Sequence, residues 1–191
     1  MAKPVKRFWA YLLGLLGLYA SAASAQSGFL CNPNIVGGND SKENAGCIDV
    51  LSWSWGAATS ITDFSGMGTR SASAPSLQNV TITKQADESS EDLFRHVATG
   101  QPIPGVVEYR EYPVCTPSCP ASEPFLKIRM SNVLLSSFSV GGSEGDQPFE
   151  SVSLDFEAIS YCQRPVGDGG VLGAEQCFAF SRATNKSITP F

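Results

Sequence analysis

Histidine is nearly absent from this chain, as are the motifs that hold nucleotides or a catalytic zinc. His96 is the only histidine, so a histidine zinc site has no basis and a Ser-His-Asp triad would have one candidate base. Residues 141–145 formally match G-x-S-x-G, but that nucleophile motif needs a following helix, and the segments on both sides here have strand patterns. No P-loop, dinucleotide fingerprint or H-E-x-x-H is present. We therefore expect no catalytic residues, no cofactor and no metal site.

Long apolar runs are also missing, with one short exception near the start of the chain. Residues 8–20 are apolar, but about 13 residues fall short of the roughly 20 that span a bilayer. This run follows basic residues within 1–7 and precedes an A-x-A cleavage pattern at 23–25. We expect residues 1–25 to be a secretory signal peptide and residues 26–191 to form a single domain with an ordinary core.

Positive charge is scarce once that segment is removed. Lys3, Lys6 and Arg7 would leave with it, so 10 of the 13 Lys and Arg and all 18 Asp and Glu would remain, a net charge of −8. An acidic surface repels phosphate backbones, so nucleic-acid binding is not expected. Cleavage also removes the apolar run, and we expect no membrane association afterwards.

The six cysteines all lie beyond residue 25. An even number of cysteines behind an export signal predicts three disulfides, formed in a periplasm or outside the cell. Six cysteines allow 15 connectivities, and the sequence does not choose among them. Zinc is disfavoured because the closest pair is C-x-x-x-C around two prolines, not C-x-x-C. Pairing neighbours along the sequence gives our expectation: Cys31 with Cys47, Cys115 with Cys119, and Cys162 with Cys177.

Residues 125–161 have the pattern of one long β-hairpin. Apolar and polar residues alternate over 126–131 and again over 152–158, the period of two that places one face on a core. Asn132 interrupts the first arm, which predicts a β-bulge, and Gly and Ser at 141–146 supply a turn. Two long paired strands indicate an antiparallel sheet, not a helix bundle.

The remaining segments supply shorter strands and one helix. We expect strands near residues 28–31, 47–56, 77–83, 106–110 and 175–182. The one convincing helix runs from Glu91 to Ala98, with Ser89 as N-cap and Gly100 at the C-cap. Acidic residues gather between Asp87 and Asp92, and helix capping and solvation explain them better than acid/base catalysis or calcium binding. The proline-rich segment 113–124 predicts a rigid loop.

Trp53 and Trp55 lie two residues apart in the 47–56 strand and so share a face, opposite Ile48 and Val50. Two tryptophans on one strand face are consistent with a carbohydrate-stacking platform. They are also consistent with packing in the core or at a subunit interface, which we favour because each ring buries a large area.

Residues 57–76 are rich in Gly, Ser, Thr and Ala and lack a strand or helix period of their own. A loop of about 20 residues is uncommon in a compact domain unless it has a function. Its isolated apolar residues are Ile61, Phe64 and Met67. One interpretation is a loose surface loop, and the other is an arm that packs on another subunit through those three side chains.

Taken in order, these segments resemble the haemolysin-coregulated protein family, Hcp, the tube protein of bacterial type VI secretion. The likeness is carried by Ile48–Gly56, by Leu77–Lys84 leading into the helix that ends at Gly100, by Val133–Gly142 and by Glu150–Phe156. Each segment alone is ordinary strand sequence, and their order and spacing carry the specificity.

The resemblance implies a mainly β fold: a closed barrel of antiparallel strands with one short flanking α-helix. It also implies a six-membered ring, stacked into a tube that is expelled and can carry effector proteins in its lumen. In the family the loop after the Trp-containing strand, here 57–76, reaches toward a neighbouring subunit and the pore. The subunit interface predicted for this chain comprises Trp53, Trp55, Ile61, Phe64 and Met67.

The signal peptide, the cysteines and the 113–124 insertion depart from the family pattern. Family tube proteins lack a signal peptide, and a copy exported by one could not load into a cytoplasmic sheath. We therefore expect a structural, non-enzymatic homo-oligomer in the periplasm or outside the cell. The alternative is a monomeric extracellular binding module that kept the barrel and binds a ligand at Trp53 and Trp55 or at the barrel mouth.

Overall fold

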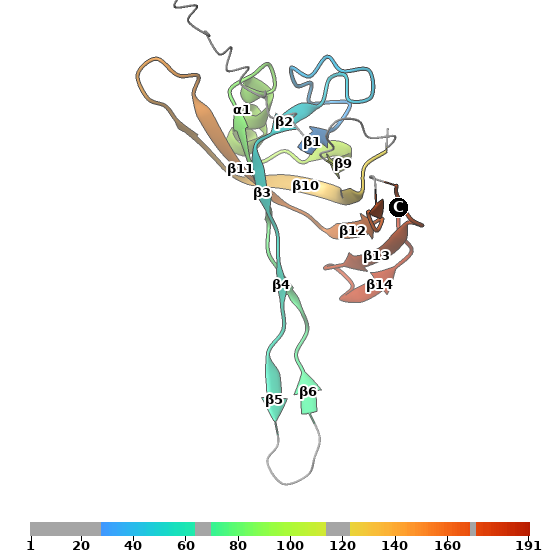
Figure 1. The fold of residues 1–191 in the computed structure, drawn as a ribbon. Helices are drawn as coiled ribbons and strands as arrows, with labels where there is room; N and C mark the ends of the chain where they lie inside the picture. The colour runs from blue at the N-terminus through green and yellow to red at the C-terminus, as the bar shows by residue number, and fades with distance from the viewer. Residues whose placement is uncertain (1–27, 64–69, 114–122, 169–170) are drawn as a thin grey trace, which may run out of the picture.

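The computed structural model describes residues 28–63, 70–113, 123–168 and 171–191. The predicted signal peptide, the Cys115–Cys119 pair, Phe64 and Met67 lie outside these ranges. Within them the chain is mainly β-strand, with antiparallel pairing throughout the described sheets (Figure 1). This confirms the predicted fold class.

The predicted hairpin is the longest feature of the sheet. β10 (Leu126–Gly141) pairs along its second half with β11 (Phe149–Asp155) and along its first half with β12 (Ala158–Gln163). Asn132 has a φ of 48°, and the register of β10 shifts there, between Ser131 and Val133. The predicted β-bulge is therefore confirmed, and it lets one strand serve two parts of the sheet.

The strands around β10 form a circuit in which all links but one are strand pairings. Its other members are β1 (Gly28–Cys31), β2 (Ile48–Val50), β3 (Ser52–Ser54), β8 (Val80–Gln85) and β9 (Ile103–Glu111). The path runs from β10 through β9 and β1 to β2, and returns from β3 through β8 and β11. Because β2 continues into β3 at Leu51, whose N–H donates to the Thr83 carbonyl (2.8 Å), the circuit closes through the backbone. The pairings and this backbone step together arrange the strands in a barrel-like form, in which no hydrogen-bonded ladder joins β2 to β3 among the described residues.

The change of partner at Leu51 corrects one expectation. We predicted one continuous strand over residues 47–56, with Ile48, Val50, Ser52 and Ser54 on one face, although the apolar residues change from even to odd positions between Val50 and Leu51. In the structure Ile48 and Val50 are buried, and past the break Trp53 is half-buried, so the inward positions move from even to odd numbers. The break lets one segment pair with β1 first and with β8 afterwards.

Two further strands extend the sheet beyond β12. They are β13 (Gln176–Ser181) and β14 (Lys186–Ile188). The prediction of a strand near 175–182 is confirmed, whereas β14 was not predicted. The Cys162–Cys177 disulfide joins directly opposed residues of β12 and β13.

The single helix in the described ranges, α1 (Ser90–Thr99), extends the predicted one by one residue at each end. Gly100 closes it with a φ of 64°, as predicted. Ser89 is the N-cap residue, but its hydroxyl donates to Asp87 Oδ1 (2.5 Å) and accepts no hydrogen bond from a helix amide. Leu93 is fully buried and fixes the helix to the core. No helix among the described residues is long and apolar enough to cross a membrane.

The core lies inside the circuit and consists of the inward residues of its strands. They include Ile48, Val80, Ile82, Ile128, Met130, Val133, Val152, Leu154 and Phe156, each at most 2 % exposed. Val152, Leu154 and Phe156 occupy the alternating positions that predicted the return arm of the hairpin. The hydrophobic pattern therefore sets the register of the central strands.

Candidate functional site

We expected the segment after β3 to be a loop. It forms instead a long two-stranded ribbon that projects from the barrel (Figure 1). Its strands are β4 (Ala57–Ala58), β5 (Ile61–Asp63), β6 (Arg70–Ala72) and β7 (Ser76–Leu77). β4 pairs with β7 and β5 pairs with β6. We call residues 57–77 the ribbon. The expectation of a segment without regular structure was wrong.

Hydrogen bonds join the two pairs of strands into one unit. The Ser73 amide donates to the Ser60 carbonyl (2.9 Å), and the Ser60 amide donates to Ser73 Oγ (3.0 Å). Thr59 Oγ1 donates to the Ser73 carbonyl (2.8 Å). Small polar side chains thus replace hydrophobic cross-strand pairs, which is why the sequence carried no strand signal.

The ribbon is exposed on both faces. Residues 57–62 and 70–76 are all exposed, and Ile61 keeps 58 % of its surface. Ile61 pairs with Ala72 on one face, and Thr62 pairs with Ser71 on the other. A two-stranded hairpin alone is marginally stable in water. The ribbon therefore has the properties of a segment that becomes buried against a partner.

Trp53 and Trp55 lie where the ribbon leaves the barrel. Trp53 lies against Tyr109 (ring centroids 5.0 Å apart) and donates from Nε1 to Glu111 Oε2 (3.1 Å). Trp55 stacks on Tyr161 (6.1 Å). Both indoles are half-buried and pack against the core. Packing therefore accounts for both side chains better than a carbohydrate platform, while a role for them at a subunit interface remains a prediction.

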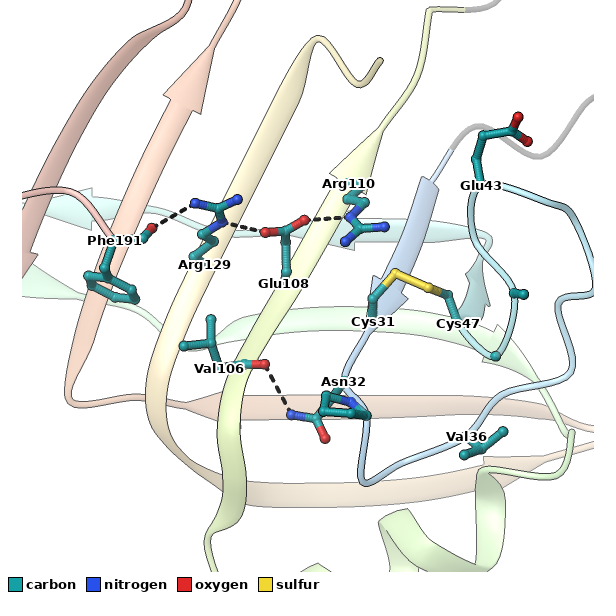
Figure 2. Close-up of a pocket in the computed structure, with 13 residues that line it drawn as sticks. Cys31, Asn32, Val36, Glu43, Cys47, Val106, Glu108, Arg110, Arg129 and Phe191 are labelled. Carbon is teal, nitrogen blue, oxygen red and sulfur yellow. Dashed lines mark hydrogen bonds and ion pairs between the residues drawn. A yellow bond between two sulfur atoms is a disulfide. The ribbon is translucent and has the colours of Figure 1, made fainter. Parts of the chain in front are cut away.

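A cavity of about 680 Å³ lies between the 32–47 loop and the outer faces of β9 and β10 (Figure 2). A row of charges forms part of its wall: Arg110 Nε and Arg129 Nε each donate to one oxygen of Glu108. Arg129 also donates to the Phe191 carbonyl (3.0 Å). The charged groups in this wall satisfy one another, so the cavity presents mainly paired charges to a ligand.

The charge of Glu108 is stabilised by these two neighbours. Burial raises the pKa of Glu108, but the hydrogen bonds and charges of Arg110 and Arg129 outweigh burial and hold its pKa below the usual value of 4.5. The depressed pKa means that Glu108 stabilises the fold above about pH 4.5, and that this contribution is lost as pH falls through the folded-state pKa.

We expect Glu108→Gln to unfold at a lower temperature than the wild type at pH 6, because the ion pairs are lost. The difference should shrink as the pH falls from 5 to 3, since the wild-type carboxylate then becomes protonated as well. Thermal melts followed by circular dichroism at each pH measure this. A difference that stays constant across this range would contradict the assignment.

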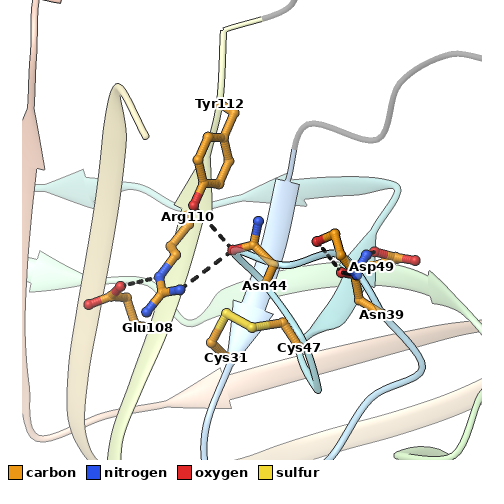
Figure 3. Close-up of a disulfide and its surroundings, with 9 residues drawn as sticks. Cys31, Asn39, Asn44, Cys47, Asp49, Glu108, Arg110 and Tyr112 are labelled. Carbon is orange, nitrogen blue, oxygen red and sulfur yellow. Dashed lines mark hydrogen bonds and ion pairs between the residues drawn. A yellow bond between two sulfur atoms is a disulfide. The ribbon is translucent and has the colours of Figure 1, made fainter. Parts of the chain in front are cut away.

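Two of the three predicted disulfides are confirmed. Cys31 is joined to Cys47 and Cys162 to Cys177. Around the first, Asn44 Oδ1 accepts hydrogen bonds from Tyr112 Oη (3.2 Å) and Arg110 (3.5 Å), which holds the 32–47 loop on β9 (Figure 3). The sequence separations are 16 and 15 residues.

A buried charge network that the sequence analysis missed fixes the start of α1. Lys84 Nζ lies 2.7 Å from Glu150 Oε2 and 2.7 Å from Asp87 Oδ1, and Ser90 Oγ donates to Glu150 (2.9 Å). Burial raises the pKa of Asp87, but the hydrogen bonds from Lys84 and Ser89 and the charge of Lys84 outweigh burial and hold the pKa below its usual value of 3.8. The sequence did offer a signal for this network: Lys84 continues the inward positions of Val80 and Ile82 in β8, where an apolar residue is expected. Its partner Glu150 is likewise a buried residue of β11.

Among the described residues, one group of side chains that could ligate a metal ion lies close together: Cys162, Glu175 and Cys177. Both cysteines are in the disulfide, and Glu175 forms ion pairs with Lys127 (2.5 Å) and Arg164 (3.6 Å). Its hydrogen bond from Lys127 lowers the pKa of Glu175. The group is therefore accounted for without a metal.

Comparison with protein families matches residues 29–162 to the family described as "Type VI secretion system effector, Hcp". The match covers both arms of the central hairpin, the helix and the ribbon. Comparison with the curated proteins finds no match.

Solved structures of type VI secretion proteins are similar to this chain. A protein described as a type six secretion system protein has a TM-score of 0.77 at 23% identity, over 86% of this chain and 100% of that one. Hcp1 from Salmonella typhimurium gives 0.65 at 23% identity, over 85% and 98%. A type VI secretion system effector from Yersinia pestis gives 0.62 at 18% identity, over 81% and 98%. These similarities concern the fold, and the family match extends over more than half of the sequence, so the chain belongs to the Hcp family of type VI secretion proteins.

Proposed function

We propose that this protein is an exported structural subunit that assembles into rings of about six copies, and that the rings stack into tubes with a lumen for effector proteins. Membership of the Hcp family supports the tube-protein role. The two described disulfides support export, because disulfides persist in oxidising compartments. The subunit acts without catalysis, and its mechanism is contact between copies in the periplasm or outside the cell.

The ribbon is the observation that carries this proposal. Residues 57–62 and 70–76 extend away from the barrel with every described side chain exposed. Such a segment contributes little to the stability of its own subunit and offers a large surface to another. We propose that Ile61, with Phe64 and Met67, packs on a neighbouring copy, and that Trp53 and Trp55 fix the direction in which the ribbon leaves the barrel.

Ile61→Glu should weaken assembly strongly, because it places a charge on the apolar face of the ribbon. The matched control is Thr62→Glu, one residue away on the opposite face and also exposed in the free subunit. Burying an unpaired carboxylate costs several kcal/mol per contact, so we expect Ile61→Glu to sediment as a monomer at concentrations where the wild type forms rings.

Sedimentation velocity at several concentrations distinguishes the outcomes. Thr62→Glu should retain most of the assembly, and circular dichroism should show both variants folded. Equal assembly by Ile61→Glu and the wild type would show that this face of the ribbon is not an interface.

The cavity beside the Cys31–Cys47 disulfide favours a second candidate function, a monomeric binding module. Its 680 Å³ lies within the range of ligand pockets. Such a module would remain monomeric at high concentration, and the exposed ribbon would then have no partner of its own kind.

A further inference from the structure

A row of apolar side chains runs out of the core onto the strands that extend the sheet. Ile128 of β10 lies directly opposite Tyr161 of β12, and Tyr161 lies directly opposite Phe178 of β13. Directly opposed residues point to the same face of a sheet. Along this row the side chains change from fully buried Ile128 through half-buried Tyr161 to Phe178, which is 61% exposed. The inward face of the sheet therefore continues beyond the barrel, where the described part of the chain leaves it uncovered.

Trp55 connects this row to the base of the ribbon. Its ring stacks on Tyr161, so Trp55 and Phe178 lie on the same side of the sheet. The next residue, Gly56, accepts a hydrogen bond from the Gln78 amide (2.8 Å), where the two ribbon strands leave the barrel. We call Trp55, Tyr161 and Phe178 the aromatic strip. The strip is thus continuous with the surface for which we propose contact between copies.

The ribbon alone offers too little surface for a stable contact. A standard interface uses about 20 to 30 residues on each side. Only one face of the ribbon carries Ile61, so roughly half of residues 57–77 can reach a surface that packs on that face. An interface between copies therefore needs a further apolar surface, and that surface must be exposed in the free subunit.

The ribbon and the aromatic strip are both nearly uncharged, although the chain is acidic. Residues 57–62 and 71–77 contain no Asp, Glu, Lys or Arg, and Asp63 and Arg70 lie directly opposite each other. Beside the strip, on the same face, Gln163 lies opposite Gln176. Two copies of a chain with a formal net charge of −5 repel each other, and contact through neutral surfaces adds no further like-charge repulsion.

The two surfaces lie at the same end of the subunit. Figure 1 shows β12, β13 and β14 on the side of the barrel from which the ribbon projects, whereas the turn of the β10–β11 hairpin lies at the other end. All copies in a closed ring have the same orientation relative to its axis, so their ribbons and strips lie at one level. Ring neighbours meet through two different surfaces, which a ribbon on one copy and a strip on the next provide.

We infer that the aromatic strip of one copy binds the ribbon of its ring neighbour, an inference that rests on the proposed function. Ile61 of the neighbour's ribbon packs on Tyr161 and Phe178, and the small polar side chains around it let the ribbon backbone approach the rings. Phe178 is the anchor, because its burial removes a large apolar area from water. Trp55 then contacts both ribbons, since it also holds the base of the ribbon of its own copy.

Photochemical cross-linking identifies what covers Phe178. The variant Phe178→4-benzoylphenylalanine of the oxidised chain from residue 26 is mixed with an excess of ¹⁵N-labelled wild type, irradiated after assembly and digested for mass spectrometry. We expect cross-links to ¹⁵N-labelled peptides that contain residues 57–62 or 71–76. The matched control is Phe149→4-benzoylphenylalanine, which places the same group on an exposed aromatic position near the hairpin turn, and it should give no ribbon cross-link.

A second variant measures the contribution of Phe178 to assembly. Phe178→Gln should raise the concentration at which light scattering detects rings by at least about tenfold, as truncation of an interface anchor does. Phe149→Gln should assemble like the wild type. Both residues are exposed in the free subunit, so circular dichroism should show both variants folded.

The outcomes separate this inference from the proposed function. Rings of the wild type without ribbon cross-links from position 178 overturn the inference and leave the ring proposal intact, and so does assembly of Phe178→Gln at the wild-type concentration. Ribbon cross-links confined to unlabelled peptides overturn it too, because the strip would then bind the ribbon of its own copy. A wild type that stays monomeric overturns the proposed function and the inference together.

Discussion

Lys84→Met should destabilise the protein by about 3–5 kcal/mol at pH 7, because it leaves a buried charge without its partner. The Lys84 side chain is fully buried, and that of Glu150 is 3% exposed. Methionine retains most of the apolar stem of lysine but removes the ammonium group, which leaves the Glu150 carboxylate buried with only Ser90 Oγ as a described donor. Urea unfolding followed by circular dichroism measures the loss.

Two further variants identify the cause of that loss. Lys84→Met/Glu150→Leu removes both charges, and replacing a buried ion pair by apolar residues is often close to neutral, so most of the lost stability should return. Arg95→Gln breaks an ion pair with Asp92 in which Arg95 is 58% exposed, and should cost at most about 1 kcal/mol. If Lys84→Met costs no more than Arg95→Gln, the network does not hold the helix to the barrel.

Replacing residues 59–75 by Asn-Gly should abolish assembly while the subunit stays folded. The replacement joins the paired residues Ala58 and Ser76 by a two-residue turn that suits a hairpin. Because the described part of the removed segment is exposed, the free energy of unfolding should change by about 1 kcal/mol or less. Light scattering should show a monomer at concentrations where the wild type forms rings.

A truncated protein that still forms rings would place the interface on the barrel wall. The ribbon would then need a different role, such as contact between stacked rings or with cargo. A truncated protein that unfolds would show that the ribbon stabilises its own subunit, contrary to its exposure in the structure.

The sequence predicted the central strands well because burial imposes a period of two on them. Val152 and Leu154 alternate with Ser153 and Asp155, and each buried residue is completely enclosed. Asn132 indicated the bulge because it is a polar residue that interrupts an apolar alternation and tolerates positive φ. The helix was found for a similar local reason, since its acidic start and Gly100 mark both ends.

Features that depend on partners far away in the sequence were missed. The consecutive apolar residues Val50 and Leu51 shift the apolar positions from even to odd, but the sequence alone does not show which strands pair on either side of this shift. The ribbon has no buried face, so its strands show no hydrophobic period. The charge row at Glu108 joins β9 to β10, and nothing in either strand alone indicates that the charges meet.

The site could be predicted in part. Composition singled out residues 57–76 as either a loose loop or a subunit arm, and a function for them stays a prediction; cysteine spacing gave the two described disulfides. The placement of Cys31–Cys47 between β1 and β2 required the fold, because these strands are separated by the 32–47 loop and meet only in the sheet.

The most direct test of assembly is the mass in solution of the oxidised chain from residue 26, measured by light scattering after gel filtration and followed by negative-stain imaging. The account predicts rings of about six subunits. A monomer that persists at high concentration would contradict it and would direct attention to ligands of the cavity beside the Cys31–Cys47 disulfide.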